Sequence, residues 1–254
     1  KLHKALSSIE EVLNSYSTTA RHLSQVAGLL NFISRTVTYG HSFLRRIYDA
    51  IANKPLSSIV RVNQGIKSDL QIWKSFLSNH SGVTLLSPSA YLKPPFPVLQ
   101  TDASFIAYAA IYNNQYIQEE WTTKFMKTHP SICLLELFAV CVGLYVFRHI
   151  FSHKRIIIKC DNKPVVRMLS RQTSKSKDCM CLIRMVVSLC LQFSMSLQPQ
   201  WLQSSQNIQP DLLSRLKNTE FMTLFGSQNF TKVKPPVFLH PISRRKLRSL
   251  SSHL

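Results

Sequence analysis

The spacing of apolar residues changes once along the chain, and this change limits the folds available to it. Before residue 83, apolar side chains recur every three or four positions, as they do on one face of a helix. Prolines then gather at positions 88, 94, 95 and 97, and the helical period is lost. We therefore expect a helical region over residues 1–82, a linker over residues 83–97 and a second domain after it.

Three segments of the N-terminal region have helical spacing. In "STTARHLSQVAGLLNFIS", Leu23, Val26 and Leu30 share one face, and Ser17–Thr19 offer candidate caps. The segments "SFLRRIYDAI" and "GIKSDLQIWKSFLSNH" repeat the pattern. These features predict a small all-helical unit.

The second domain alternates between strand and helix patterns. Three strands are predicted in "PVLQTDAS", "FIAYAAIYNN" and "QYIQEEW", followed by a long buried helix in "SICLLELFAVCVGLYVFRHIF". A strand in "RIIIKCDN", helices in "KPVVRML" and "KDCMCLIRMVVSLCLQ", a strand in "MSLQPQWLQ" and a short helix in "QPDLLSRL" complete it. This order predicts a mixed α/β domain over residues 98–218.

The charge of the chain is strongly positive. Lys and Arg outnumber Asp and Glu by 31 to 12, for a net charge of +19, which favours a polyanionic partner, above all nucleic acid. No apolar run approaches the roughly 20 residues of a membrane-spanning helix, so no membrane partner is expected. Residues 219–254 are predicted to form a basic, flexible tail that is either simply solvated or a nucleic-acid contact. The six cysteines lack CxxC spacing and are interpreted as reduced core residues.

Four acidic residues lie in sequence that ought to be buried. Asp102 lies in a strand, Glu136 in an apolar helix, Asp161 at the end of an isoleucine-rich strand, and Asp211 opens the "DLLSR" helix. A buried carboxylate is costly unless it is paired or bound to a cation, and no Lys or Arg is periodically matched to each of these acids. A shared divalent metal would remove the difficulty, because Mg²⁺ and Mn²⁺ prefer oxygen ligands.

Each acid also has an ordinary structural alternative. Any one of them could cap a helix or lie at the surface, and for Asp211, directly after Pro210, a first-turn position is natural. Spacing alone leaves the two interpretations open.

A family resemblance favours the metal site. The segments "TDAS", "LLELFAV", "CDNKPVV" and "NIQPDLLSR" resemble, in order, the four-acid pattern of the ribonuclease H domain in retroelement reverse transcriptases. The resemblance implies a ribonuclease H-like fold, a mixed five-stranded sheet flanked by helices. It also implies an enzyme that cuts the RNA strand of RNA/DNA hybrids with two bound Mg²⁺ or Mn²⁺ ions. The four residues that would hold these ions are Asp102, Glu136, Asp161 and Asp211.

The resemblance extends upstream of this domain. The segments "LSQVAGLLNF", "GHSFLRRIYDAI" and "IKSDLQIWKSFLSNHSGVTLL" are similar to the thumb or connection region of DIRS-like, tyrosine-recombinase-class retrotransposons. This implies a polymerase domain in the same polyprotein as partner, with the present chain as a piece of it. No Y-x-D-D aspartate pair occurs, so polymerisation by this chain is not expected. Retroelement replication places such a protein inside the cell, in nucleus or cytoplasm.

Several polar residues are candidates for nucleic-acid binding. Asn162 either contacts a 2′-hydroxyl or orients a ligand, or else forms a turn at the strand end; Asn207 either braces the loop before Asp211 or caps the next helix. The arginines of the N-terminal region either contact phosphates or are ordinary surface charges. The full set is Arg45, Arg46, Ser104, Asn162, Asn207 and Arg215.

The sequence also departs from the family pattern. The family's glycine-rich "GWGA" is replaced by "AYAA" at residues 107–110, "LQSSQN" lacks an expected glycine, and no His lies between 154 and 239. The alanines are harmless if the backbone is regular there and disabling if a positive φ or close approach to substrate is required. The alternative functions are therefore a decayed or domesticated nucleic-acid-binding module, or a basic chromatin or RNA-binding protein.

Overall fold

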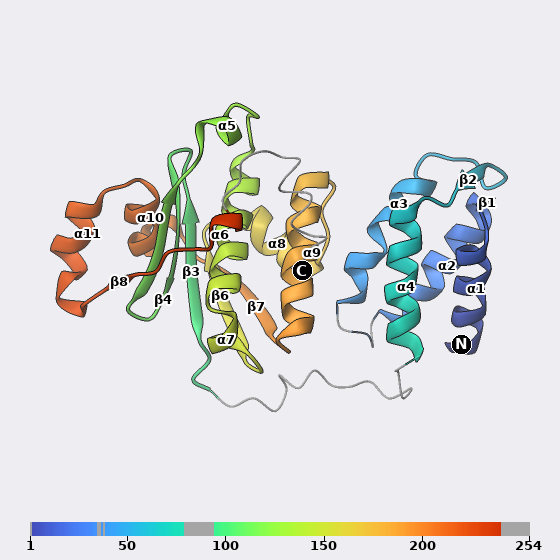
Figure 1. Ribbon diagram of the computed structural model, residues 1–254, viewed down its shortest axis with the longest axis horizontal. Coiled ribbons are helices and arrows are strands. Elements are labelled where there is room, and N and C mark those ends of the chain that lie inside the picture. Colours follow the sequence, from blue (N-terminus) through green and yellow to red (C-terminus); the bar gives the residue numbers. More distant parts are fainter. Residues whose placement is uncertain (1, 35–36, 38, 79–93, 240–254) are drawn as a thin grey trace. The chain divides into compact units, whose positions relative to one another are not determined.

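The computed structural model describes residues 2–34, 37, 39–78 and 94–239 and divides the chain into two compact units, Lys1–Ala90 and Tyr91–Leu254 (Figure 1). The division falls inside the expected linker of residues 83–97, of which residues 83–93 lie outside the described residues. Proline-rich sequence thus coincides with the change from one unit to the other.

The N-terminal unit packs four α-helices around a common core. Thr19 precedes α2, and its side-chain oxygen accepts a hydrogen bond from the His22 backbone N–H, satisfying one of the free donors of the first turn. Trp73 of α4 and Leu30 of α2 are fully buried. The helices are α1 (Leu2–Asn14), α2 (Ala20–Ile33), α3 (Arg45–Ile51) and α4 (Gln64–Ser78), with a 3₁₀ turn η1 (Gly40–Phe43).

The sequence predicted that this unit is all-helical, and that prediction is wrong. Strand β1 (Ser17–Thr19) pairs antiparallel with β2 (Ile59–Arg61), with Thr18 opposite Val60. Three residues are too few to show the alternating pattern that reveals a strand. Helix α1 also lies outside the three segments that we predicted to be helical.

The C-terminal unit is built on a mixed sheet with strand order β7-β6-β3-β4-β5-β8. Neighbours β7/β6, β6/β3 and β5/β8 are parallel, whereas β3/β4 and β4/β5 are antiparallel. The α/β class is confirmed and is consistent with a ribonuclease H-like fold, although the sheet has six strands rather than five. The strands are β3 (Val98–Ala103), β4 (Ala107–Tyr112), β5 (Gln115–Glu120), β6 (Arg155–Cys160), β7 (Ser196–Trp201) and β8 (Thr231–Lys232).

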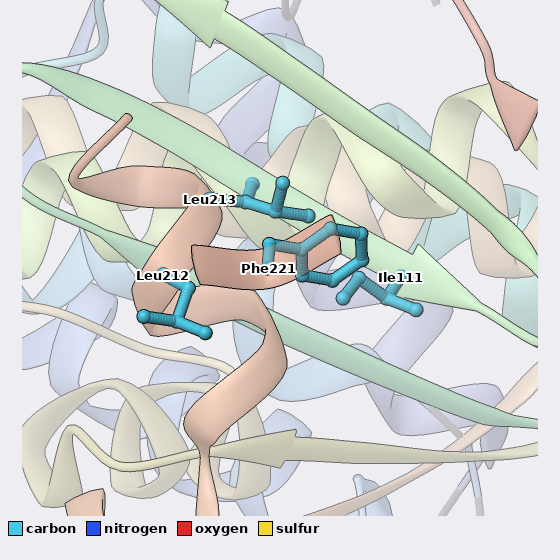
Figure 2. Close-up of a cluster of buried hydrophobic side chains, with 5 residues drawn as sticks. Ile111, Leu212, Leu213 and Phe221 are labelled. Atoms are coloured by element: carbon cyan, nitrogen blue, oxygen red, sulfur yellow. The ribbon is translucent and has the colours of Figure 1, made fainter. Parts of the chain in front are cut away.

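Helices cover both faces of this sheet (Figure 1). Helix α6 is apolar almost all round because it lies between the sheet and α9; Gly143 of α6 faces Leu99 and Ala110. On the opposite face, α10 and α11 pack on β4 through a buried apolar cluster of Ala109, Ile111, Leu212, Leu213 and Phe221 (Figure 2). The helices are α5 (Thr123–Met126), α6 (Ile132–Val146), α7 (Arg148–Phe151), α8 (Lys163–Arg171), α9 (Lys177–Gln192), α10 (Ile208–Ser214) and α11 (Asn218–Phe225).

The prediction of a flexible tail from residue 219 is wrong for residues 219–239. Phe221 of α11 is buried in the apolar cluster, and β8 adds to the sheet beside β5, with Gln115 opposite Thr231. Short 3₁₀ turns, η4 (Gly226–Gln228) and η5 (Val237–Leu239), flank β8. The basic and serine-rich composition suggested a tail, although a few aromatic side chains attach residues 219–239 to the domain. Residues 240–254 lie outside the described residues.

The hydrophobicity of the helices is that of buried core rather than of membrane spans. Within residues 2–34, 39–78 and 94–239, no helix is both long and apolar enough to cross a bilayer. All six cysteines are free thiols, and four of them are buried: Cys141, Cys160, Cys179 and Cys190. The prediction of core cysteines is confirmed for these four, whereas Cys133 and Cys181 are only partly buried.

Replacing Gly143 by alanine is expected to lower the free energy of unfolding of the C-terminal unit by about 1–2 kcal/mol. An added Cβ would lie 3.0 Å from Ala110 Cβ and 3.0 and 3.1 Å from the Leu99 methyl groups, so α6 or these side chains must shift by a few tenths of an ångström. Urea unfolding followed by circular dichroism measures the change. The control is Gly28→Ala in α2, where nothing lies within 4 Å of the added Cβ and a gain of about 0.5–1 kcal/mol is expected. A gain at both positions would contradict the close packing of α6.

Candidate active site

Two parallel strands bring two of the predicted acids together. In the β3/β6 ladder, Leu99 lies opposite Ile158 and Gln100 opposite Lys159. Continuing this register by two residues places Asp102, near the end of β3, beside Asp161, which directly follows β6. Carboxyl ends of parallel strands meet at one sheet edge, so the fold itself creates this pair.

Electrostatic coupling joins the other two acids to this pair. Burial, followed by the negative charges of Asp102 and Asp161, raises the pKa of Glu136 in α6 to about 9. Burial, together with the negative charges of Asp161 and of Asp211 in α10, raises the pKa of Asp102 to about 6, even though the hydrogen bond from Ser214 lowers it. Since such repulsion requires proximity, the structure brings together all four acids that the sequence predicted.

The donor atoms at this edge suit a hard cation. The ligand atoms of Glu136, Cys160 and Asp161 all lie within 4.8 Å of one another. Burial raises the pKa of the Cys160 thiol, so the group stays protonated, and its Sγ lies 3.8 Å from Glu136 Oε2 as a weak donor. The remaining donors are carboxylate oxygens, which fit Mg²⁺ or Mn²⁺ rather than a thiophilic metal. Sequence analysis missed Cys160, because we interpreted all six cysteines as core residues.

Asp102 is oriented from α10 by two polar side chains. The Ser214 hydroxyl donates a hydrogen bond to Asp102 Oδ2. Buried Asn207 donates through Nδ2 to the Thr101 carbonyl oxygen at 3.0 Å and, at 3.4 Å, to Asp102 Oδ1. Asn207 precedes α10 without a side-chain capping bond, so it braces the loop rather than capping the helix. The role of Ser214 was not predicted, since only its spacing after Asp211 marks it.

Asp211 is held by a neighbour on its own helix. Arg215 Nε lies 2.7 Å from Asp211 Oδ1 in an i, i+4 ion pair, so the expectation that no basic residue matches each acid is wrong for this one. Helix α10 begins at Ile208, so Asp211 does not open the helix but lies in its first turn, as the structural alternative expects. The pair is partly exposed, which makes its contribution to stability small but still fixes the direction of the carboxylate.

Two further candidates are engaged within the chain. Asn162 caps α8: its Oδ1 accepts a hydrogen bond from Val165 N at 3.2 Å, as the turn alternative expects. The Ser104 hydroxyl donates to the Ser214 carbonyl oxygen at 2.6 Å and accepts from Ile106 N at 3.0 Å. Ser104 therefore joins the β3–β4 turn to α10. Asn162 and Ser104 thus stabilise the segments next to Asp161 and Asp102.

Arg45 and Arg46 lie in the N-terminal unit and are both ion-paired. Arg45 pairs with Asp49 along α3, and Arg46 Nη1 lies 2.9 Å from Asp69 Oδ1. Asp69 is fully buried, so Arg46 compensates a charge that would otherwise be costly. This contact agrees with an ordinary structural role for Arg46; phosphate binding by either arginine stays a prediction.

The alanines that replace the family's glycines lie in regular backbone. Residues 107–110 form β4, none of them has a positive φ, and all four are buried. Ala109 lies directly opposite Asp102 across the antiparallel β3/β4 ladder. A requirement for a positive φ is therefore excluded at this position, whereas the alternative of close approach to substrate stays open.

Trp201, the last residue of β7, lies at the same edge. Its indole Nε1 donates a hydrogen bond to the Asp161 carbonyl oxygen at 2.8 Å, while 46% of the residue remains exposed. The Lys163 ammonium lies 4.3 Å from the centroid of the ring. A tryptophan thus fixes the backbone at one of the four acids.

Comparison with known proteins leaves this geometry as the main guide. No protein-family model matches the chain, and no curated protein matches it significantly. Function is therefore argued from the four acids, their supports and the fold that positions them.

Without divalent ions, the free energy of unfolding is expected to fall as pH rises from about 6 to about 9. Folded Glu136 keeps its proton to about pH 9, whereas the unfolded side chain loses it near 4.5, so the folded state binds more protons in this window. One such group contributes a slope of up to about 1.4 kcal/mol per pH unit. Urea unfolding in chelator at a series of pH values measures the slope.

Glu136→Gln removes the titrating group and is expected to flatten this pH dependence. The control, Glu120→Gln at the exposed end of β5, should leave it as in the wild type. Equal slopes for wild type and Glu136→Gln would contradict a buried, proton-binding Glu136.

Proposed function

We propose that residues 98–218 form a metal-dependent ribonuclease H that hydrolyses the RNA strand of RNA/DNA hybrids. The observation that carries the proposal is the convergence of four acids at the edge where β3 and β6 end: Asp102 is coupled to Asp161 and Asp211, and Glu136 to Asp102 and Asp161. Four acids that repel one another in a half-buried site destabilise the protein unless a cation neutralises them. The net charge of +19 favours a polyanionic substrate, and metal-dependent chemistry on such a substrate would explain a cluster of acids in so basic a chain.

The four carboxylates are the residues that would hold two Mg²⁺ or Mn²⁺ ions. When bound, such ions lower the pKa of a water and stabilise charge on the leaving oxygen of a phosphodiester. Ser214 and Asn207 hold the Asp102 carboxylate in one orientation, and Arg215 holds that of Asp211. Glu136 carries a proton at neutral pH and must release it to become a ligand, so cation affinity rises with pH. The expected products carry 3′-hydroxyl and 5′-phosphate ends.

The wider setting of this activity is proposed on the resemblance alone. The N-terminal unit would serve as the thumb or connection region of a DIRS-like reverse transcriptase, with a polymerase domain in the same polyprotein as its partner. Replication of such an element would take place in the nucleus or the cytoplasm. Recognition of the RNA strand would use its 2′-hydroxyl groups, which distinguish RNA from DNA.

The test is cleavage of a labelled RNA strand in an RNA/DNA hybrid by the full chain. Cleavage is expected with Mg²⁺ or Mn²⁺ and not with chelator, and Asp102→Asn or Asp161→Asn should lower the rate at least about 100-fold, because each removes a charged ligand. Single-stranded RNA and double-stranded DNA of the same sequence test the substrate class. The matched control is Glu120→Gln, an exposed acid away from the cluster.

Two other outcomes would redirect the proposal. Salt-sensitive binding of the hybrid without cleavage, unchanged when the polymerase portion is supplied, would favour the catalytically decayed binding module. The absence of a histidine between residues 154 and 239 favours that alternative, since the resemblance implies that such a histidine assists product departure. Cleavage that survives both Asp→Asn changes would exclude the four-acid site as its source.

A further inference from the structure

Lys163 and Trp201 form a cation–aromatic pair directly beside the four acids. The Lys163 ammonium lies 4.3 Å from the centroid of the Trp201 ring, and the ring's Nε1 donates to the Asp161 carbonyl oxygen at 2.8 Å. Lys163 is the first residue of α8, and Trp201 is the last residue of β7. Two elements far apart in sequence thus converge on the peptide that carries the Asp161 carboxylate.

Core packing does not account for this tryptophan. Trp201 is 46% exposed, whereas Trp73 and Trp121 are buried in the cores of their units. An exposed indole with its N–H already bonded offers a surface of fixed direction, because the hydrogen bond restrains the ring. Aromatic faces attract ammonium groups, and tryptophan does so best. The ring therefore restrains a side chain that would otherwise move freely in solvent.

The charge of Lys163 remains available to an external anion. Lys163 is exposed, and within the described part of the chain no carboxylate forms an ion pair with it. The other cation of the site, Arg215, is already paired with Asp211 at 2.7 Å. Cation–aromatic contact restrains the ammonium without neutralising it. Of the two cations, Lys163 is thus the one that can accept a phosphate.

We propose that Lys163 binds a backbone phosphate of the nucleic acid next to the bond to be cut, and that Trp201 is a positioning residue that holds Lys163 there. The inference rests on the proposed function and deepens it by naming a contact to the substrate. A phosphate that approaches four carboxylates is repelled by them, and a restrained cation beside Asp161 offsets that repulsion. Restraint before binding lowers the entropy lost when the contact forms.

The test is a double-mutant cycle on hybrid binding by the full chain. Lys163→Gln, Trp201→Ala and the double variant are compared with wild type in chelator, where a metal-dependent reaction cannot proceed, at several salt concentrations. Trp201→Phe keeps an aromatic ring but removes the N–H that bonds to Asp161. The charge control is Arg171→Gln, an exposed cation farther along α8. Thermal unfolding of each variant verifies that it is folded.

Lys163→Gln is expected to weaken binding about 5–10-fold and to lower the slope of log affinity against log salt by about one, as for the loss of one phosphate contact. Trp201→Ala should weaken binding about threefold to fivefold with a smaller change in slope, because the lysine remains but is no longer restrained. Trp201→Phe should restore part of this loss. The double variant should bind as Lys163→Gln does, so the two effects are not additive.

Independent, additive effects of the two substitutions would overturn the positioning role of Trp201. An equal loss of affinity and slope with Arg171→Gln would overturn a specific contact by Lys163. If wild type binds the hybrid but does not cut it with metal, and the cycle is still non-additive, the inference stands while the nuclease activity fails. If wild type cuts the hybrid and both variants match it in affinity and KM, the inference alone fails. Wild type that does not bind the hybrid overturns both.

Discussion

Repulsion among four carboxylates is the constraint around which the C-terminal unit is arranged. Burial, followed by neighbouring charges, raises the pKa of Glu136 and of Asp102, so the folded protein favours a proton or a metal ion at this edge of the sheet. Hydrogen bonds from several elements stabilise the charged forms of these two acids. The Cys160 thiol and the Ala103 backbone donate to Glu136, and the Ser214 hydroxyl donates to Asp102. The site is thus polar at its centre and is supported by groups that donate hydrogen bonds.

Packing on both faces of the sheet makes this site rigid. On one face, Tyr108, Trp121 and Phe138 form a cluster of aromatic rings with centroids 4.8 to 5.5 Å apart, which holds α6 and hence Glu136. On the other face, the apolar cluster around Phe221 holds α10 and hence Asp211 (Figure 2). Side chains fixed by packing stay in one geometry, and catalysis by positioned groups requires that. The hydrophobic core and the polar site are therefore parts of one arrangement.

Sequence patterns predicted the parts of this molecule that repeat or extend. The strands of residues 98–218 and the helices α6, α8, α9 and α10 were predicted in the right order, because each is long enough to show its period, and the four acids interrupt apolar runs. The short helix α5 was not predicted, and the single helix predicted over residues 131–151 is divided into α6 and α7. Features that depend on distant partners were missed. Strand β8 has only two residues and exists because β5 accepts it, and the bonds of Asn207 and Ser214 to β3 cross more than 100 positions of sequence. Cys160 and Trp201 acquire meaning only when β6, α6 and β7 have been placed.

The ends of the sheet determine how much unpaired strand backbone is open to a second chain. An edge strand exposes unpaired backbone groups that can recruit a second chain, and long, flat edges are the most hazardous. Among the described residues, the sheet ends on one side in β8, which is only two residues long, and on the other in β7, which carries Pro199 and packs against α8. Proline lacks an N–H, and a two-residue strand offers little backbone to pair with. Strands β6, β3 and β4, which contain β-branched and aromatic residues and would aggregate readily as open edges, are thus kept in the interior of the sheet.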